Sequence, residues 1–150
     1  MTVESGGLQE ALAELAQRSR KLYQIDCRFR RVKPGLNLTG TSAIHLYRIA
    51  QEAVGNAIKH GKAKRIDIGL VENGNDLVLS VRDSGIGLPA KLPARAGMGL
   101  RVMQHRAGII GGTLDVHAGH QGGTSVICSV RDYQFKSNQE NGNETQKRAK

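Results

Sequence analysis

Apolar residues recur at helical spacing in three stretches of the chain, residues 6–23, 41–61 and 99–112. One stripe of the first stretch carries four leucines: Leu8, Leu12, Leu15 and Leu22. This stripe covers about two heptads, fewer than the three or four that a coiled coil needs, so it predicts packing against the core. The second stretch is the longest helical signal of the chain.

The ends of these helices carry local signals. Thr41 or Ser42 is predicted to cap the first turn of the second helix, and Gly61 is predicted to end it. The third helix is predicted to end at the glycine pair Gly111-Gly112. The chain therefore contains three well-delimited helical segments.

Apolar and polar residues alternate in five other stretches, which predicts half-buried strands. These stretches are residues 24–32, 64–71, 76–83, 113–118 and 123–133. Asn73-Gly74, between the second and the third stretch, is a strong hairpin signal. The order of elements predicts an α+β fold, a two-layer α/β sandwich with about three helices on one face of a mixed, mostly antiparallel sheet of about five strands.

The apolar pattern stops after Tyr133. Residues 136–150 contain one alanine as their only apolar residue, so residues 134–150 are expected to form a disordered polar tail behind one domain over residues 1–133. Cys27 and Cys128 fall in strand patterns far apart, which predicts buried thiols and no disulfide. No apolar run approaches the ~18 residues of a membrane span, and a cytoplasmic location is expected.

Charge and aromatic content narrow the choice of partner. The formal net charge of the 150 residues is +9, which fits either an anionic ligand or a solvated basic surface. The chain has no tryptophan, three tyrosines and two phenylalanines. This scarcity argues against base stacking on aromatic side chains, and we expect no nucleic-acid partner.

The polar face of the second helix contains residues that a solvated surface does not explain. The apolar face holds Leu46, Ile49, Ala50, Ala53, Val54 and Ala57. The other face holds Arg48, Glu52, Gly55, Asn56 and Lys59, with His60 at its edge. Gly55 and Asn56 each cost ~0.5–1 kcal/mol in a helix interior relative to alanine. An amide oxygen on Asn56 suits Mg²⁺, Lys59 suits a phosphate, and Glu52 suits a metal-bound water or a reacting proton.

Asp83 stands at the end of a predicted strand and is followed by Gly85 and Gly87. The glycines permit positive φ and let a flat ligand lie against the backbone. A carboxylate only accepts hydrogen bonds, so it fits the exocyclic amine of adenine and opposes the carbonyl oxygen of guanine. An ordinary Asp-Ser-Gly turn is the structural alternative.

Three motifs occur in a fixed order: QEAVGNAIKH at residues 51–60, DSGIG at 83–87 and GMGL at 97–100. They resemble the three boxes of the Bergerat-type ATP-binding catalytic domain of sensor histidine kinases, and the resemblance covers roughly residues 7–131. The sequences of residues 46–66 and of the third helix are similar to those of one subgroup, the nitrate-sensor-like kinases. The chain contains no P-loop and no complete dinucleotide-binding fingerprint.

The resemblance implies roles for the residues of the first motif. Asn56 would hold the Mg²⁺ that bridges the phosphates of ATP, and Lys59 and His60 would approach those phosphates. Glu52 would polarise the attacking histidine or position a water on the Mg²⁺.

The resemblance also implies the adenine site and the lid. Asp83 would read the adenine amine with help from Thr124, beside a turn made by Gly85 and Gly87. Residues 88–97 would form the ATP lid. The hinge and the phosphate-binding amides would come from Gly97, Met98, Gly99 and Leu100. His105 stands where this subgroup often has glutamate. Arg106 is predicted to be structural, with contact to the ligand as the alternative.

The implied activity is transfer of the γ-phosphoryl group of ATP to a histidine. None of the five histidines stands in an acceptor-helix setting. The acceptor is therefore expected on a separate dimerisation domain, with a cognate response regulator as an indirect partner and a parent protein that is either free or membrane-bound. The alternative is an anti-sigma-factor-like serine kinase, a regulatory binding module of the same fold. A gyrase- or chaperone-type clamp would need further domains.

Overall fold

The computed structural model describes residues 3–30, 40–86, 96–119 and 122–131. Its helices are α1 (Val3–Tyr23), α2 (Thr41–Lys59) and α3 (Ala96–Ile109). Its strands are β1 (Asp26–Arg30), β2 (Arg65–Asn73), β3 (Asp76–Asp83), β4 (Gly112–Ala118) and β5 (Thr124–Val130). The expected tail over residues 134–150 and residues 88–95 of the lid expected over 88–97 lie outside the described residues.

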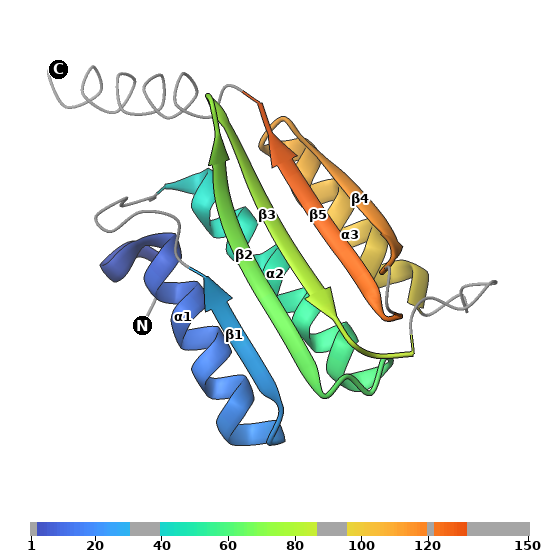
Figure 1. The fold of residues 1–150 in the computed structure, drawn as a ribbon. Helices are drawn as coiled ribbons and strands as arrows, with labels where there is room; N and C mark the ends of the chain where they lie inside the picture. Colours follow the sequence, from blue (N-terminus) through green and yellow to red (C-terminus); the bar gives the residue numbers. More distant parts are fainter. Residues whose placement is uncertain (1–2, 31–39, 87–95, 120–121, 132–150) are drawn as a thin grey trace, which may run out of the picture.

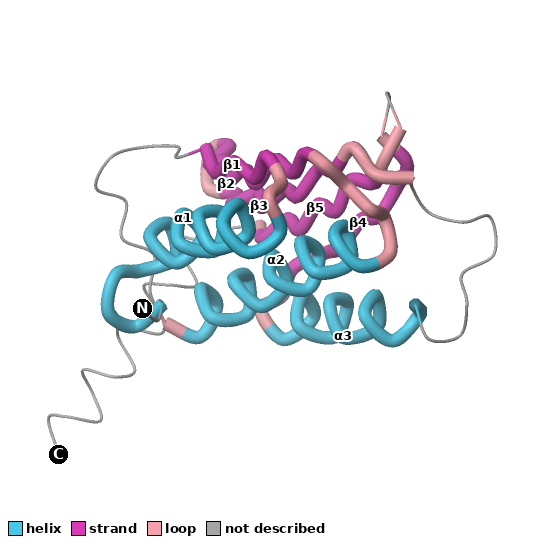
Figure 2. The backbone as a smooth tube through the Cα atoms, turned by 90° about the horizontal axis from the view of Figure 1, so that it is seen from below, coloured by secondary structure: helices cyan, strands magenta, loops and turns pink. Residues whose placement is uncertain are grey.

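The strands form one sheet in the order β1-β2-β3-β5-β4 (Figure 1). β1 pairs with β2 in parallel, and the other three pairs are antiparallel. All three helices cover the same face of this sheet (Figure 2). The predicted two-layer sandwich with a mixed, mostly antiparallel sheet is confirmed.

The core lies between the helices and the inner face of the sheet. The six apolar positions predicted for α2 are all buried, and so are Leu8, Leu12 and Leu15 of α1. The prediction for Leu22 is wrong, because this side chain is 73% exposed. Burial on α1 stops at Ser19, and residues 20–23 are all exposed, so the leucine stripe continues past the surface on which the helix packs.

The start of α2 differs from the sequence prediction. The N-cap is Gly40, with φ 91°, and no side chain caps the helix, so the predicted cap on Thr41 or Ser42 is wrong. The φ of Gly40 lies in the left-handed region, which favours glycine. Thr41 is therefore the first residue inside the helix and not its cap. At the other end the helix closes on His60, directly before Gly61, as predicted.

The remaining local predictions concern the hairpin and the cysteines. β2 and β3 form a hairpin in which Asn73 pairs with Asp76, and Gly74 has φ 64° in the turn. Cys27 and Cys128 are buried free thiols, and burial raises the pKa of each to about 11. Both thiols are therefore protonated at neutral pH and act as small core side chains.

Candidate functional site

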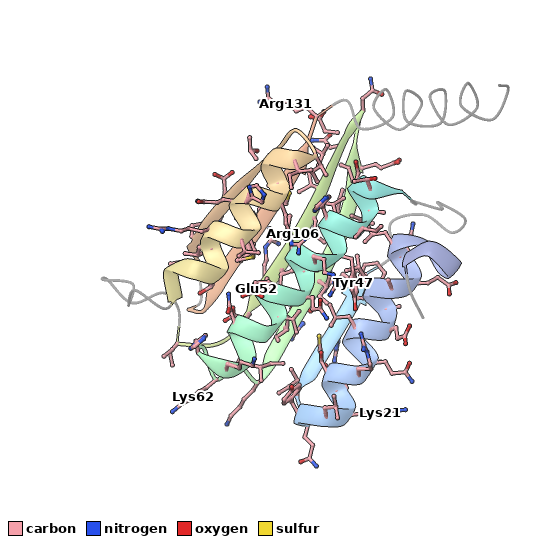
Figure 3. All side chains as sticks on the ribbon, turned by 180° about the vertical axis from the view of Figure 1, so that it is seen from behind. Lys21, Tyr47, Glu52, Lys62, Arg106 and Arg131 are labelled. Atoms are coloured by element: carbon pink, nitrogen blue, oxygen red, sulfur yellow. The ribbon has the colours of Figure 1, made fainter. Side chains whose placement is uncertain are left out.

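Glu52 and Asn56 occupy one stripe of α2, and each is half-buried. They are four residues apart, which places them on neighbouring turns of the same helix face. This face looks towards α3, which packs beside α2 in the helical layer (Figure 3). The two oxygen-bearing side chains are therefore presented together at the contact between the two helices.

Gly99 of α3 lies directly against this pair. A Cβ atom added at Gly99 would sit 2.7 Å from Glu52 Oε1 and 3.1 Å from Asn56 Nδ2. Any larger residue would push the Glu52 carboxylate or the Asn56 amide aside. The third sequence motif thus packs against the first, although Gly99 stands 43 positions after Asn56 in the chain.

Asp83 is the last residue of β3, and its carboxylate organises the turn that follows. Its Oδ1 accepts a hydrogen bond from the Gly85 amide at 2.8 Å and another from the Thr124 amide of β5 at 3.3 Å. Within the part of the chain that the structure describes, no hydrogen bond reaches Oδ2. One carboxylate oxygen of Asp83 therefore fixes the turn, and the other takes no part in it.

Gly85 is needed for a reason that differs from the one predicted. Its φ is not positive, but a Cβ atom there would collide with the Gly61 carbonyl oxygen. The same oxygen accepts a hydrogen bond from the Ile86 amide at 2.9 Å. The turn after Asp83 is therefore packed backbone against backbone onto the end of α2.

Two glycines that sequence reasoning did not assign to the site complete this arrangement. Gly61 was interpreted as a helix end, yet its carbonyl anchors the turn at Gly85. Gly123, with φ 76°, lets the chain pass so close to Asp83 that an added Cβ would collide with its carbonyl oxygen. The glycine pair before Thr124 was the sequence signal for this second close approach.

Several predicted residues lie at the edge of the site or beyond the described part. Lys59 and His60 are exposed at the end of α2, near the turn at Gly61. Gly87 lies outside the described residues. Gly97 and Met98 belong to the first turn of α3, which starts at Ala96, three residues earlier than predicted.

The oxygen atoms of Glu52 and Asn56, beside Gly99, suit a hard cation as ligands. In the described ranges, no three His, Cys, Asp or Glu side chains come together as a ligand cluster. Glu52 and Asn56 offer a carboxylate and an amide oxygen side by side near Gly99. Mg²⁺ accepts such oxygen ligands and needs only one or two from the protein when phosphates and waters supply the rest.

A second polar contact links α2 to α3, further along both helices. Arg106 Nη1 lies 3.2 Å from His45 Nδ1. Arg106 therefore makes the structural type of contact that the sequence predicted for it. Sequence reasoning did not foresee His45 as its partner, although His45 stands seven residues before Glu52 and thus on the same helix stripe.

Among the helices that the structure describes, none is long and apolar enough to span a membrane.

Residues 41–134 match the family described as histidine kinase-, DNA gyrase B- and HSP90-like ATPase. This match begins at α2 and includes every residue of the site described above.

Curated relatives are named as sensor proteins. The nitrate/nitrite sensor protein NarQ of Escherichia coli (strain K12) is 36% identical over 146 residues, which are 93% of this chain and 25% of that protein. The sensor histidine kinase LiaS of Bacillus subtilis (strain 168) is 33% identical over 133 residues, 87% of this chain and 36% of that protein. The chain thus spans about a quarter to a third of the length of these relatives.

Solved structures share the fold at low identity. The ATP-binding domain of PrrB from Mycobacterium tuberculosis has a TM-score of 0.65 at 20% identity, covering 83% of this chain and 93% of that domain. The histidine kinase domain of the Erythrobacter litoralis EL346 blue-light activated kinase has a TM-score of 0.70 at 18% identity, covering 91% and 67%. The chain therefore belongs to the histidine kinase-, DNA gyrase B- and HSP90-like ATPase family and has the fold of a histidine kinase ATP-binding domain.

Proposed function

We propose that this chain is the Mg·ATP-binding catalytic domain of a two-component sensor histidine kinase. The observation that carries the proposal is that two distant segments pack onto α2: the turn after Asp83 at its end, through Gly61, and Gly99 of α3 against Glu52 and Asn56. The relatives support it, because they are named as nitrate/nitrite sensor proteins and sensor histidine kinases.

In this proposal Asp83 binds the exocyclic amine of adenine. Its Oδ1 is occupied by the amides of Gly85 and Thr124, so Oδ2 accepts from the ligand. Guanine presents a carbonyl oxygen at the same place. Binding of guanine is disfavoured because this oxygen and the Asp83 carboxylate are both hydrogen-bond acceptors. Gly85 and Gly87 form the turn on which the base lies, and Thr124 assists Asp83.

The phosphates run from this turn along α2 towards the start of α3. Asn56 Oδ1 is the proposed protein ligand of Mg²⁺, and Lys59 and His60 add positive charge at the exposed end of the helix. Backbone amides over residues 97–100 face the phosphates at the positive end of the α3 dipole. A Mg²⁺ held by Asn56 would supply charge neutralisation for the transferred phosphoryl group.

Glu52 is the proposed residue for the transfer step. Its Oε1 lies at the contact with Gly99, one helical turn from Asn56. From there the carboxylate accepts the proton of an attacking imidazole or orients a water on the Mg²⁺, as the resemblance implies. The remaining requirement of phosphoryl transfer is positioning, which the contact between α2 and α3 supplies.

The acceptor histidine belongs to a part of the parent protein beyond this domain. We place it on a dimerisation domain, and we place the catalytic domain at residues 1–133, with a polar tail over 134–150. The cognate response regulator is an indirect partner, and the site faces the cytoplasm whether the parent is free or membrane-bound.

Phosphate transfer tests the proposal directly. The chain is incubated with Mg²⁺, γ-labelled ATP and a separately produced dimer of the parent's acceptor helices. We expect acid-labile, base-stable label on the dimer, and slow transfer with Glu52→Gln at nearly unchanged ATP affinity. Recovery of a sigma factor in a pull-down, with no label on the dimer, would instead support the serine-kinase alternative, and a chain that binds no Mg·ATP would refute the proposal.

A further inference from the structure

The contact between His45 and Arg106 joins the two helices that carry the phosphate end of the proposed site. The two atoms, His45 Nδ1 and Arg106 Nη1, are 3.2 Å apart and come from residues 61 positions apart in the chain. A guanidinium donates hydrogen bonds and accepts none. His45 Nδ1 must therefore be the acceptor, so the ring is neutral and carries its proton on Nε2.

The position of this contact is matched to the site by helix geometry. His45 and Glu52 are seven residues apart on α2, and Arg106 and Gly99 are seven residues apart on α3. Seven residues rise about 10.5 Å along a helix and return to nearly the same face. Gly99 contacts Glu52 at one end of the α2–α3 interface, and Arg106 contacts His45 at the other end. The two helices therefore run antiparallel and touch at both points.

The arrangement is visible in the side-chain view. Figure 3 shows Arg106 between α3 and α2, with Glu52 further along the same side of α2 and Tyr47 on the side of α1. The seam between α2 and α3 thus has a polar contact at His45 and the functional residues at its other end.

The surroundings of His45 oppose a positive charge on its ring. Burial lowers the pKa of His45, and the charges of Arg106 and then His105, both on α3, lower it further. From α1 and the strands under α2, no charged group of the described ranges adds to this effect. On α2 itself, Arg48 donates to Gln51.

We propose that His45 is a positioning residue: its neutral ring accepts the hydrogen bond of Arg106 and thereby keeps α3 seated on α2, with Gly99 against Glu52 and Asn56. This inference rests on the proposed nucleotide site. Protonation turns Nδ1 into a donor and sets two cations face to face, so the contact is lost. The start of α3 then moves away from α2, and nucleotide affinity falls in acid.

The first test compares Mg·ATP binding by calorimetry across about pH 5 to pH 8, the range in which histidine titrates. The chain, His45→Gln and His45→Lys are measured together. ATP takes up a proton of its own in this range, but equally for all three proteins, so the affinity ratio between them is the readout.

Glutamine keeps an acceptor at every pH, and lysine keeps a cation at every pH. We expect the chain to match His45→Gln near pH 8 and to bind about tenfold more weakly near pH 5, within the usual range of coupling between sites. His45→Lys should bind weakly throughout. Arg18→Met is the matched control, because it removes an arginine contact to α2 on the side of α1, the 2.9 Å bond to the Tyr47 hydroxyl, and should change nothing.

The second test needs no ligand and separates this inference from the proposed function. Amide hydrogen exchange over residues 99–106 is compared between the chain and His45→Gln at the same pH. Faster exchange in the chain only in acid supports the positioning role, even if ATP fails to bind and the proposed function falls. A constant affinity ratio, or equal exchange at every pH, would overturn the role of His45.

Discussion

Single glycines at this site are set by what lies next to them. At Gly85 the neighbour is a backbone carbonyl, which cannot move without shifting the end of α2. At Gly99 the neighbours are the tips of the Glu52 and Asn56 side chains, which can move but would lose their places. The first glycine therefore protects the shape of a turn, and the second protects the arrangement of functional groups.

At the residue scale, Asp83→Asn tests base recognition. The asparagine oxygen can still accept from the amides of Gly85 and Thr124, so the turn should survive. Its NH₂ group then faces the adenine amine, donor against donor. Loss of a charge-assisted hydrogen bond worth about 1.5–3 kcal/mol should weaken ATP binding roughly ten- to hundredfold.

Isothermal titration with ATP and GTP measures this effect, and thermal unfolding checks that the fold is retained. Equal ATP affinity for the chain and for Asp83→Asn would remove Asp83 from the base-binding role.

At the scale of elements, α2 carries two tasks on opposite faces. One face packs six apolar side chains against α1 and the sheet, and the other presents Glu52 and Asn56 to α3. Its C-terminus also receives the turn after Asp83 through the carbonyl of Gly61. A shift of this one helix would therefore disturb the core, the proposed metal-binding end and the proposed base-binding end together.

Gly55 on α2 offers a test at this scale. A Cβ atom added there meets nothing within 4 Å, and the same holds for Gly108 on α3. Replacing either with alanine should stabilise its helix by about 0.5–1 kcal/mol, because glycine loses more backbone entropy on folding.

Thermal unfolding of Gly55→Ala and Gly108→Ala should show midpoints raised by about 1–4 °C for a domain of this size. If Gly55 leaves room for the nucleotide, Gly55→Ala alone should lose Mg·ATP affinity, whereas Gly108→Ala should keep it. A lower melting midpoint in both variants would contradict the account of the two helices.

At the scale of the whole molecule, the sheet order decides which segments meet. β5 pairs with β3 rather than staying at the edge with β4, and this pairing brings Thr124 beside Asp83. The helical layer then brings α3 beside α2. The site is therefore assembled from parts of the chain between residues 52 and 124, with each part held by a different contact of the fold.

The pH dependence of folding belongs to this scale. The pKa of His45 is lowered in the folded chain, so the unfolded chain takes up this proton first, as pH falls through about 6.5. From there down to the lowered pKa the unfolded state binds more protons, and the free energy of unfolding decreases.

Denaturant unfolding of the chain and of His45→Gln at several pH values measures this contribution. The difference in the free energy of unfolding between the two proteins should be constant above about pH 6.5. Below this pH the chain should lose stability relative to His45→Gln. Curves that stay parallel down to acid pH would show that His45 titrates alike in both states.

The sequence by itself determined the elements and the fold class, and it supplied the candidate residues of the proposed site. Periodicity is a local property, so α2, the β2–β3 hairpin and the buried Cys27 of β1 could be predicted from the sequence. Local propensity gave the wrong cap at Thr41 or Ser42, because the positive φ of Gly40 starts α2 instead. The leucine stripe at Leu22 also misled, since spacing does not tell where the packing partner ends.

Only the tertiary structure decided how the motifs meet. Strand order, the approach of Gly85 to Gly61 and the contact of His45 with Arg106 join residues far apart in the chain. Such contacts depend on the packing of whole elements, which no window of neighbouring residues contains. The residue types that suit the proposed chemistry could therefore be identified from the sequence. The distances between these residues depend on how the helices and the sheet pack together.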